Sequence, residues 1–298
     1  MVSSFVNESR RIRRLLIVAV VFFPFVIAAP KRRPTIFCVI HTTASAHETR
    51  LATILRTWAR HCDEKLVFTD APLLNHPDVP HVYFPTMATR SHSWEKIRRV
   101  FRFIHESVGD RFDWILRADD DSYVVMENAR RLAAEFDPQR PLVLGYRWGF
   151  FEACRKGSFL FTLSRGYTDG GVYLVSREGA RVFNEIMQNE TICPDFHRAE
   201  EDQELARCMA RAGIFPTNTR DAEGRDRFHH FHVDELNGWT LQYFLRHYTF
   251  YKFKRFPEEI SDTSVSFHHL SPYEMLVADY LTSRLKLKSL GLSTANFS

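Results

Sequence analysis

The chain alternates between short apolar runs and longer stretches whose apolar residues recur every three or four positions. The short runs predict buried strands at Thr35–His41, Leu66–Thr69, His81–Phe84, Trp114–Leu116 and Leu142–Leu144. The periodic stretches predict amphipathic helices at Glu48–Arg60, Ser93–Ser107 and Glu127–Phe136. Because strands and helices alternate in chain order, the first half predicts an α/β fold with a mainly parallel central sheet.

The second half of the chain is less regular. It predicts strands at Val172–Val175 and Ser264–Leu270, and helices at Arg177–Met187 and Glu201–Ala212. Glycines predict two interruptions of these elements: Gly145 is expected to end the strand before it, and Gly170-Gly171 predicts a turn. Neither an internal repeat nor a linker-like stretch interrupts the sequence, so we expect one continuous domain over residues 35–298.

One apolar run, Leu15–Ala29, differs from the others because basic residues flank it. Residues 1–34 carry seven Lys and Arg against one Glu, a charge of 7 − 1 = +6. The whole chain has 40 bases and 36 acids, so the remainder carries 33 − 35 = −2. Basic residues before an apolar run orient a membrane segment with its N-terminus in the cytosol. The basic surplus is therefore a signal of topology, and we expect no nucleic-acid partner.

This run predicts a cytosolic tail at 1–14, a signal-anchor transmembrane segment at 15–29, a very short stem at 30–34 and a luminal domain at 35–298. A helix of that length covers about 22 Å of a hydrocarbon core of roughly 30 Å, and snorkelling Arg and Lys side chains close the gap. Two alternatives stay open. Pro24 and the small residues near Ala28 fit a cleaved signal peptide, and the short run also fits a buried core helix.

Composition narrows the class of protein further. A content of 45% hydrophobic residues excludes a disordered chain, and 12 Gly and 13 Pro exclude a collagen-like fibre. The five cysteines, at positions 38, 62, 154, 193 and 208, allow two disulfide bridges and one leftover. Together with the glycosylation sequon Asn189-Glu190-Thr191, they agree with a secretory-pathway compartment.

The acidic run Asp119-Asp120-Asp121 follows directly on the strand that begins at Trp114. Side chains two apart on an extended chain point the same way, so Asp119 and Asp121 can face one cation. Carboxylate oxygens suit Mg²⁺ or Mn²⁺, which keep positions open for a diphosphate. The alternative interpretation is an acidic helix cap or a solvated turn. The strand before the run favours the metal site, because α/β sheets bind ligands where strands end.

Three later clusters are further candidates. His268 projects from the polar face of the late strand, where a neutral imidazole would complete a Mn²⁺ site with Asp121, although a lone His is more often structural. Glu200-Glu201-Asp202 opens a helix, where acids normally serve as caps and dipole partners; the alternative is that one of them is a general base for an incoming hydroxyl. Phe228–His232 lacks a spaced partner for zinc, so we interpret it as an aromatic–histidine strand end.

Eight ordered segments extend these signals into a longer pattern: Thr57–Cys62, Asp113–Val124, Tyr167–Gly171, Glu201-Asp202 with Cys208, Asn218–Asp221, Phe228-His229, Ser264–His268 and Ser271–Met275. In this order and spacing they resemble the inverting β1,3-glycosyltransferases of the Golgi, most closely the core 1 β1,3-galactosyltransferase family. The resemblance runs from Thr35 to Leu290.

The resemblance implies a GT-A type, Rossmann-like nucleotide-sugar-binding domain that uses Mn²⁺ and UDP-galactose. It implies a role for each residue that matches a family motif. The metal ligands are Asp119, Asp121 and His268, the catalytic base is Asp202, and the nucleotide diphosphate contacts Arg90, Trp94, Lys96 and Asp119. It also implies the cysteine pairs Cys38–Cys62 and Cys193–Cys208, with Cys154 unassigned.

The implied activity is Mn²⁺-dependent transfer of galactose, with inversion, to the 3-hydroxyl of GalNAc O-linked to Ser or Thr of glycoproteins. The implied location is the Golgi membrane, single-pass type II, with a luminal catalytic domain, a glycoprotein acceptor as partner, and a homodimer left open. Two alternatives remain: a β1,3-glycosyltransferase that uses another sugar, such as fringe-like GlcNAc transfer, or an inactive, chaperone-like relative.

The sequence also departs from the family pattern. Pro257–Ile260 stands where the family has two neighbouring cysteines, and Tyr243–Tyr248 lacks the tryptophans of the family's acceptor segment. The glycine-rich turn is one residue shorter, and Phe150–Phe161 resembles an insertion. The match is therefore closer for the metal and the donor than for the acceptor.

Overall fold

The computed structural model describes residues 32–87, 90–149 and 165–285. The described residues from Arg33 onward belong to one compact unit, in which all the features below lie. The predicted tail and anchor, Cys154 and the insertion at Phe150–Phe161 lie outside the described residues. In the part of the chain that is described, no helix has both the length and the apolar character needed to cross a bilayer.

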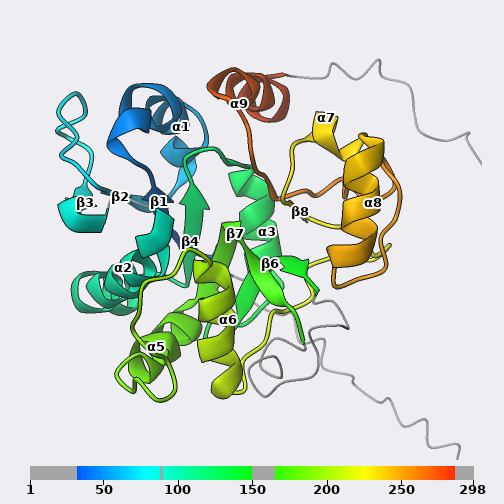
Figure 1. Ribbon diagram of the computed structural model, residues 1–298. Helices are drawn as coiled ribbons and strands as arrows, with labels where there is room; N and C mark the ends of the chain where they lie inside the picture. Colours follow the sequence, from blue (N-terminus) through cyan, green and yellow to red (C-terminus); the bar gives the residue numbers. More distant parts are fainter. Residues whose placement is uncertain (1–31, 88–89, 150–164, 286–298) are drawn as a thin grey trace, which may run out of the picture. The chain divides into compact units, whose positions relative to one another are not determined.

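A six-stranded sheet of order β3-β2-β1-β4-β7-β6 forms the centre of this unit (Figure 1). The first four strands pair in parallel, whereas β7 is antiparallel to both β4 and β6. Only β7 is therefore reversed, and the predicted mainly parallel sheet is confirmed. The strands are β1 (Ile36–His41), β2 (Glu64–Thr69), β3 (His81–Tyr83), β4 (Trp114–Asp119), β6 (Val143–Trp148) and β7 (Tyr167–Ser176).

Helices cover both faces of the sheet, which confirms the α/β class. Residues of α1, α3 and α9 pack into one hydrophobic core, and residues of α2, α5 and α6 pack into the other. The remaining helices, α7 and α8, lie beyond the β6 side of the sheet (Figure 1). The bounds are α1 (Ala52–Arg56), α2 (Ser93–Ser107), α3 (Met126–Ala134), α5 (Arg177–Ile186), α6 (Glu201–Arg211), α7 (Val233–Leu236), α8 (Trp239–Tyr248) and α9 (Pro272–Asp279).

Strand β1 shows why its sequence is continuously apolar. Alternate side chains of a strand point to opposite faces, so Ile36, Cys38 and Ile40 enter one core. Phe37 and Val39 enter the other. Because helices cover both faces of a parallel strand, both sets of side chains are buried and no polar alternation appears.

A second, three-stranded sheet has the order β5-β9-β8. Its strands are β5 (Tyr123–Val124), β8 (Phe228–His229) and β9 (Ser266–Phe267). The late strand predicted at Ser264–Leu270 is thus confirmed over two residues only, and a positive φ at His269 turns the chain after it. Pairing of Tyr123 with Phe267 joins the segment after the acidic run to the segment before His268.

One predicted helix coincides with the structure at both ends, and another is broken. The helix at Ser93–Ser107 has the predicted bounds. The stretch Glu48–Arg60 instead forms a π-helical turn, α1 and a 3₁₀ turn. The break falls at Thr57, whose backbone leaves the helical region and whose hydroxyl donates to the Thr53 carbonyl at 2.8 Å. Such back-bonding by Thr competes with the helical pattern.

Both glycine predictions were wrong, because Gly145 lies inside β6 and Gly170-Gly171 lies inside β7. At Gly145 the reason is a close approach of the two strands. A Cβ there would lie 2.3 Å from the Thr168 Cγ2 atom, and the register between the strands shifts just after this position. Glycine thus marks a crowded point of the sheet instead of its end.

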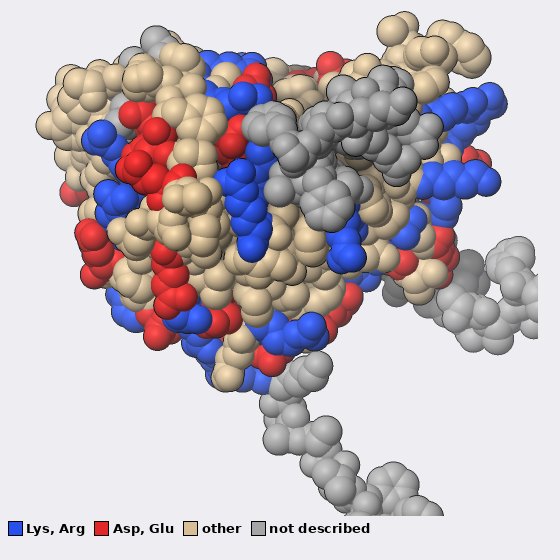
Figure 2. All heavy atoms as spheres, turned by 60° about the horizontal axis from the view of Figure 1, so that its bottom comes forward, with Lys and Arg blue, Asp and Glu red and all other residues tan. Residues whose placement is uncertain are grey.

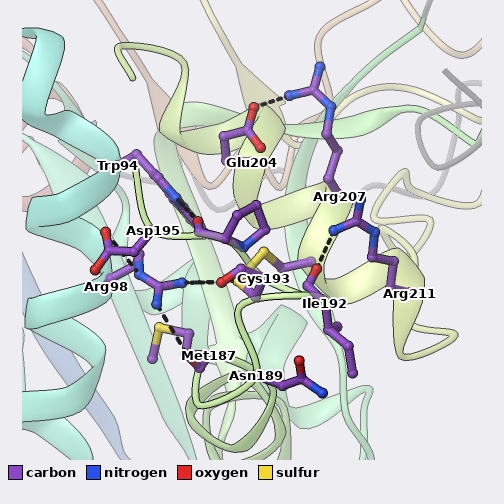
Figure 3. The surroundings of a disulfide bond; sticks show 12 residues. Trp94, Arg98, Met187, Asn189, Ile192, Cys193, Asp195, Glu204, Arg207 and Arg211 are labelled. Carbon is purple, nitrogen blue, oxygen red and sulfur yellow. Dashed lines mark hydrogen bonds and ion pairs between the residues drawn. A yellow bond between two sulfur atoms is a disulfide. The ribbon is translucent and has the colours of Figure 1, made fainter. Parts of the chain in front are cut away.

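Two disulfide bonds, Cys38–Cys62 and Cys193–Cys208, join the pairs that the resemblance implied. The first ties β1 to the end of the turn after α1. The second ties α6 to the loop that precedes it, which we call the 187–200 loop. Figure 3 shows that Trp94 and Arg98 of α2 also point at this loop. Arg98 donates to the carbonyls of Met187 and Cys193 at 3.1 and 2.8 Å.

We expect the double substitution Cys193→Ser, Cys208→Ser to lower the free energy of unfolding by about 3 kcal/mol. The bridge joins cysteines 15 residues apart, and removing it restores conformational freedom to that loop in the unfolded chain. Urea unfolding of the variant and the parent, with circular dichroism as a check of native secondary structure, measures the difference. An unchanged unfolding midpoint would contradict the prediction.

The described surface carries both signs of charge. Figure 2 shows Lys and Arg side chains interspersed with Asp and Glu over one face. This mixture agrees with the charge of −2 that remains after residues 1–34 are set aside.

Candidate active site

A cleft of about 650 Å³ opens at the edge of the central sheet where β1 and β4 end. Strand β7 begins at the same edge because it runs antiparallel to β4. Open α/β sheets bind ligands at the carboxyl ends of their parallel strands. Six of the seven predicted site residues, from four separate parts of the chain, line the cleft: Arg90, Lys96, Asp119, Asp121, Asp202 and His268.

The side chains of Asp119, Asp121 and His268 converge on one point. His268 Nε2 lies 2.9 Å from Asp121 Oδ1 and 3.8 Å from Asp119 Oδ2. One ligand atom from each residue lies within 4.8 Å of the other two. The short sheet produces this arrangement, because β9 delivers His268 beside the acidic run, and Leu270 N donates to Asp121 O at 2.8 Å.

The carboxylates of this cluster favour a bound positive charge. Burial raises the pKa of Asp119 to about 6, Arg117 and His268 oppose the rise, and the carboxylates of Asp121 and Asp120 add to it. Burial lowers the pKa of His268, but its hydrogen bond to Asp121 and the nearby carboxylates raise that pKa above its usual value overall. Two carboxylates and one imidazole are ligands that Mn²⁺ accepts, so these residues fit a divalent cation.

The middle residue of the run, Asp120, has a different environment. Its Oδ2 accepts a hydrogen bond from the Thr42 hydroxyl at 2.7 Å, and Arg50 Nη1 lies 3.4 Å from its Oδ1. Neither partner belongs to the three-residue cluster. The extended chain expected here was wrong, because β4 ends at Asp119 and residues Asp120 and Asp121 form a turn closed by Ser122 N, which donates to Asp119 O at 3.2 Å. This turn, and not strand alternation, separates Asp120 from the other two carboxylates.

Arg117 is a central residue of the site that the sequence prediction missed. Its side chain is 5% exposed, and Nη2 lies 2.8 Å from Asp119 Oδ1 and 3.1 Å from Glu201 Oε1. Its Nη1 donates to the carbonyl of Gly170. The signal was a basic residue inside the otherwise apolar run Trp114–Ala118 of this strand, since such a residue needs buried partners.

The two acidic residues at the start of α6, Glu201 and Asp202, lie in different environments. Glu201 is 5% exposed and turns inward to Arg117, and burial raises its pKa to about 8. Asp202 is half-buried, and its Oδ1 accepts from Gln203 N at 2.8 Å. Burial and the charge of Asp169 raise the pKa of Asp202 to about 6. A carboxylate with that pKa can accept a proton near neutral pH.

Gly170 and Gly171 of β7 bring the two parts of the site together. A Cβ on Gly170 would lie 3.5 Å from the Cβ of Asp202, whereas one on Gly171 would lie 2.3 Å from Nδ1 of His268. Asp202 and His268 thus pack against adjacent residues of one strand. This close approach explains why the glycines lie in a strand although their sequence indicates a turn.

Asp169, which was also missed, links the histidines to the sheet. It is 4% exposed, and its Oδ1 accepts from His230 Nδ1 at 2.6 Å and from Trp148 Nε1 at 2.8 Å. Its Oδ2 accepts from Gly171 N at 2.9 Å and lies 4.0 Å from His268 Nδ1. Burial opposes the charge, but His230 and Trp148 hold the pKa of Asp169 well below its usual range.

Besides Asp119, three residues were expected to contact the nucleotide diphosphate, and they do not all lie in the cleft. Arg90 and Lys96 line the cleft on the side of α2. Trp94 is fully buried, packs against Phe183 and donates its indole N–H to Pro194 O at 3.0 Å. Its position therefore fits a core residue of α2, in keeping with the apolar face that its own helical spacing predicts.

We expect Gly171→Ala to weaken binding of a divalent cation at least tenfold, roughly the effect of disturbing a ligand's surroundings. The new methyl would overlap the His268 ring, at 2.3 Å from Nδ1, and displace it. Isothermal titration with Mn²⁺ measures the change. Gly170→Ala is the matched control, because its methyl meets Asp202 at an ordinary 3.5 Å. Equal Mn²⁺ affinity in both variants would contradict the expectation.

The chain is similar to named glycosyltransferases. It is 26% identical over 260 residues to glycoprotein-N-acetylgalactosamine 3-beta-galactosyltransferase 1 of Xenopus laevis, covering 86% of this chain and 68% of that protein. It is 23% identical over 190 residues to beta-1,3-glucosyltransferase of Mus musculus, covering 64% of this chain and 36% of that one. A solved structure of the galactosyltransferase LgtC with donor and acceptor sugar analogs matches with a TM-score of 0.46 and 12% identity, over 85% of this chain and 98% of that one.

The acidic cleft at the sheet edge and these relatives together define a glycosyltransferase that uses a nucleotide sugar. Residues 32–238 match the family model described as Fringe-like. The chain belongs to this Fringe-like family, and the predicted resemblance to β1,3-glycosyltransferases is confirmed.

Proposed function

We propose that this protein transfers galactose from UDP-galactose, with inversion and with Mn²⁺, to the 3-hydroxyl of GalNAc on Ser or Thr of glycoproteins. The observation that carries the proposal is the convergence of Asp119, Asp121 and His268 in one cleft with Asp202. The similarity to an N-acetylgalactosamine 3-beta-galactosyltransferase over 86% of the chain supports the choice of sugar and acceptor.

Asp119, Asp121 and His268 would hold the cation, which when bound supplies positive charge to the departing diphosphate. Arg90 and Lys96 line the same cleft and offer further positive charge to the nucleotide. Burial lowers the pKa of Lys96, while the carboxylates of Asp70 and Asp119 oppose that change. Arg117 orients Asp119 through its ion pair at 2.8 Å.

Asp202 accepts the proton of the acceptor hydroxyl as that hydroxyl attacks the anomeric carbon. The carbon–oxygen bond to the diphosphate breaks in the same step, which inverts the anomeric centre. Glu201 is a poorer candidate at neutral pH because its carboxylate is buried and is held by Arg117, whose Nη2 lies 3.1 Å from Glu201 Oε1. Asp202, with a pKa of about 6, is ionised there.

The acceptor side of the cleft is aromatic. Phe244 and Tyr248 of α8 stack on one another, with ring centroids 4.2 Å apart, and both line the cleft together with Trp148. They belong to Tyr243–Tyr248, which replaces the tryptophan-containing acceptor segment of the resembled family. Aromatic faces with polar edges suit a sugar ring, so we place the acceptor beside them.

A donor-by-acceptor screen tests the function. The first pair is UDP-galactose with a GalNAc-Ser/Thr peptide, with and without Mn²⁺, followed by UDP-glucose and UDP-GlcNAc. UDP-glucose is included because a beta-1,3-glucosyltransferase is among the similar proteins. Mn²⁺-dependent β1,3-linked galactose on the peptide is the expected product. Transfer from another donor only would overturn the choice of sugar. If the protein neither transfers the sugar nor hydrolyses the donor, the inactive, chaperone-like alternative is favoured.

The proposal includes the location. Residues 15–29 would anchor the chain in the Golgi membrane as a single-pass type II protein, with residues 35–298 as the luminal catalytic domain. The exposed sequon at Asn189 supports a luminal domain, because glycosylation occurs only on that side of the membrane. Protection of the domain from protease in intact vesicles would test this topology, and cleavage there would contradict it.

A further inference from the structure

A second group of metal-ligating side chains lies outside the cleft, at the start of α2. His92 Nδ1 and His197 Nδ1 lie 2.5 and 2.6 Å from the same carboxylate oxygen, Oε2 of Glu95. The two imidazole rings meet edge to face, with centroids 4.6 Å apart. One donor atom from each of the three residues lies within 4.8 Å of the others. None of the three lines the cleft.

The three side chains come from two distant parts of the chain. His92 and Glu95 are one helical turn apart, a spacing that places a His and a Glu on one side of a helix. His197 belongs to the 187–200 loop, which packs on α2. Trp94 N donates to Arg198 O at 3.0 Å, and Trp94 Nε1 donates to Pro194 O at 3.0 Å. The backbone therefore holds His197 beside the helix without relying on its exposed side chain.

The donor set selects a class of ion. Two imidazoles and one carboxylate are typical ligands of Zn²⁺, which also takes a water molecule in a fourth position. Mg²⁺ and Ca²⁺ prefer oxygen ligands throughout, so this set disfavours them. The side chain of His197 is 69% exposed, whereas those of His92 and Glu95 are 26% and 17% exposed. An ion can therefore enter from solvent and meet ligands that are already gathered.

We propose that His92, Glu95 and His197 form a Zn²⁺ site that joins the start of α2 to the 187–200 loop. Both joined elements border the cleft, because Arg90 and Lys96 lie on the α2 side and Glu201 and Asp202 follow the loop directly. The bound ion links the start of α2 to the 187–200 loop at a point outside the cleft, and so holds these two sides of the cleft together. The neighbouring Cys193–Cys208 bond and the contacts of Arg98 in Figure 3 anchor the other end of the same loop.

Zinc titration of the full chain tests the site. We use Asp121→Ala as the background, because it removes a ligand of the cleft cluster and leaves the second group intact. After treatment with a chelator, this protein should bind one more Zn²⁺ than the same protein that also carries His197→Ala. Loss of one ligand should weaken that site by more than about 100-fold, since even an outer-sphere change weakens metal binding roughly 10–100-fold. His105→Ala, an exposed histidine of the same helix, is the matched control and should bind as the background does.

Hydrogen exchange locates the bound ion. Zn²⁺ should slow amide exchange at the start of α2 and in the 187–200 loop of the background protein, and should leave both unchanged after His197→Ala. His92→Ala should likewise leave amide exchange unchanged by Zn²⁺. Agreement between the two variants shows that the loss comes from the site and not from a local disturbance at His197. If the background and the His197→Ala protein bind Zn²⁺ with equal stoichiometry and affinity, the three residues form only a hydrogen-bonded cluster and the proposal is overturned.

Discussion

Replacing Asp202 with Asn is expected to lower turnover by roughly 10²–10⁴-fold while UDP affinity stays nearly unchanged. Asn keeps the shape of the side chain and an oxygen that accepts from Gln203 N, now 2.8 Å from Asp202 Oδ1. It cannot take a proton from the acceptor hydroxyl. Steady-state kinetics with UDP-galactose and a GalNAc peptide, together with UDP calorimetry, measure the two effects separately.

The pH profile sharpens this test. Burial and Asp169 raise the pKa of Asp202 to about 6, and a base must be deprotonated to act. The rate of the parent enzyme should therefore fall as the pH drops through about 6 and should level off above it, whereas Asp202→Asn should lack this acid limb. Glu190→Gln, the same chemical change at an exposed position, is the control. Equal losses of turnover and UDP binding would make Asp202 a structural cap.

Replacing Asp121 with Ala is expected to abolish Mn²⁺-dependent binding of UDP. The substitution removes the carboxylate nearest to His268, 2.9 Å from Nε2, and leaves a cluster with one carboxylate and one imidazole. A two-ligand site holds a divalent cation weakly, so the diphosphate loses its counter-charge. Calorimetric titration of UDP with and without Mn²⁺ measures the loss, and thermal unfolding checks that the variant is folded.

The neighbouring Asp120→Asn is the matched control for that substitution. Asn keeps an oxygen for the Thr42 hydroxyl, which lies 2.7 Å from Asp120 Oδ2, and Asp120 does not point at the cluster. Mn²⁺-dependent UDP binding should therefore survive this change. A full Mn²⁺ response in Asp121→Ala, or its loss in Asp120→Asn, would refute the assignment of Asp119 and Asp121 as the cation ligands.

Sequence patterns best predicted those structural features that depend on residues close together in the chain. The helix at Ser93–Ser107 was predicted to the residue because its apolar spacing is uninterrupted. The acidic run was placed correctly at the end of a strand, since β4 ends at Asp119. Contacts between distant residues disturbed the other predictions: the Thr57 hydroxyl broke one helix, and close approach of Thr168 kept Gly145 inside a strand.

The sequence by itself determined the α/β order of elements and the position of the acidic motif at the end of a strand, because strand and helix periodicities are local. Only the tertiary structure decided which residues share the site. Asp202 and His268 meet at Gly170-Gly171 because β7 runs antiparallel between β4 and β6. Likewise, Glu201 pairs with Arg117 whereas Asp202, which lines the same cleft, packs against Gly170. Such pairings depend on packing between strands and helices far apart in the chain, which no local pattern records.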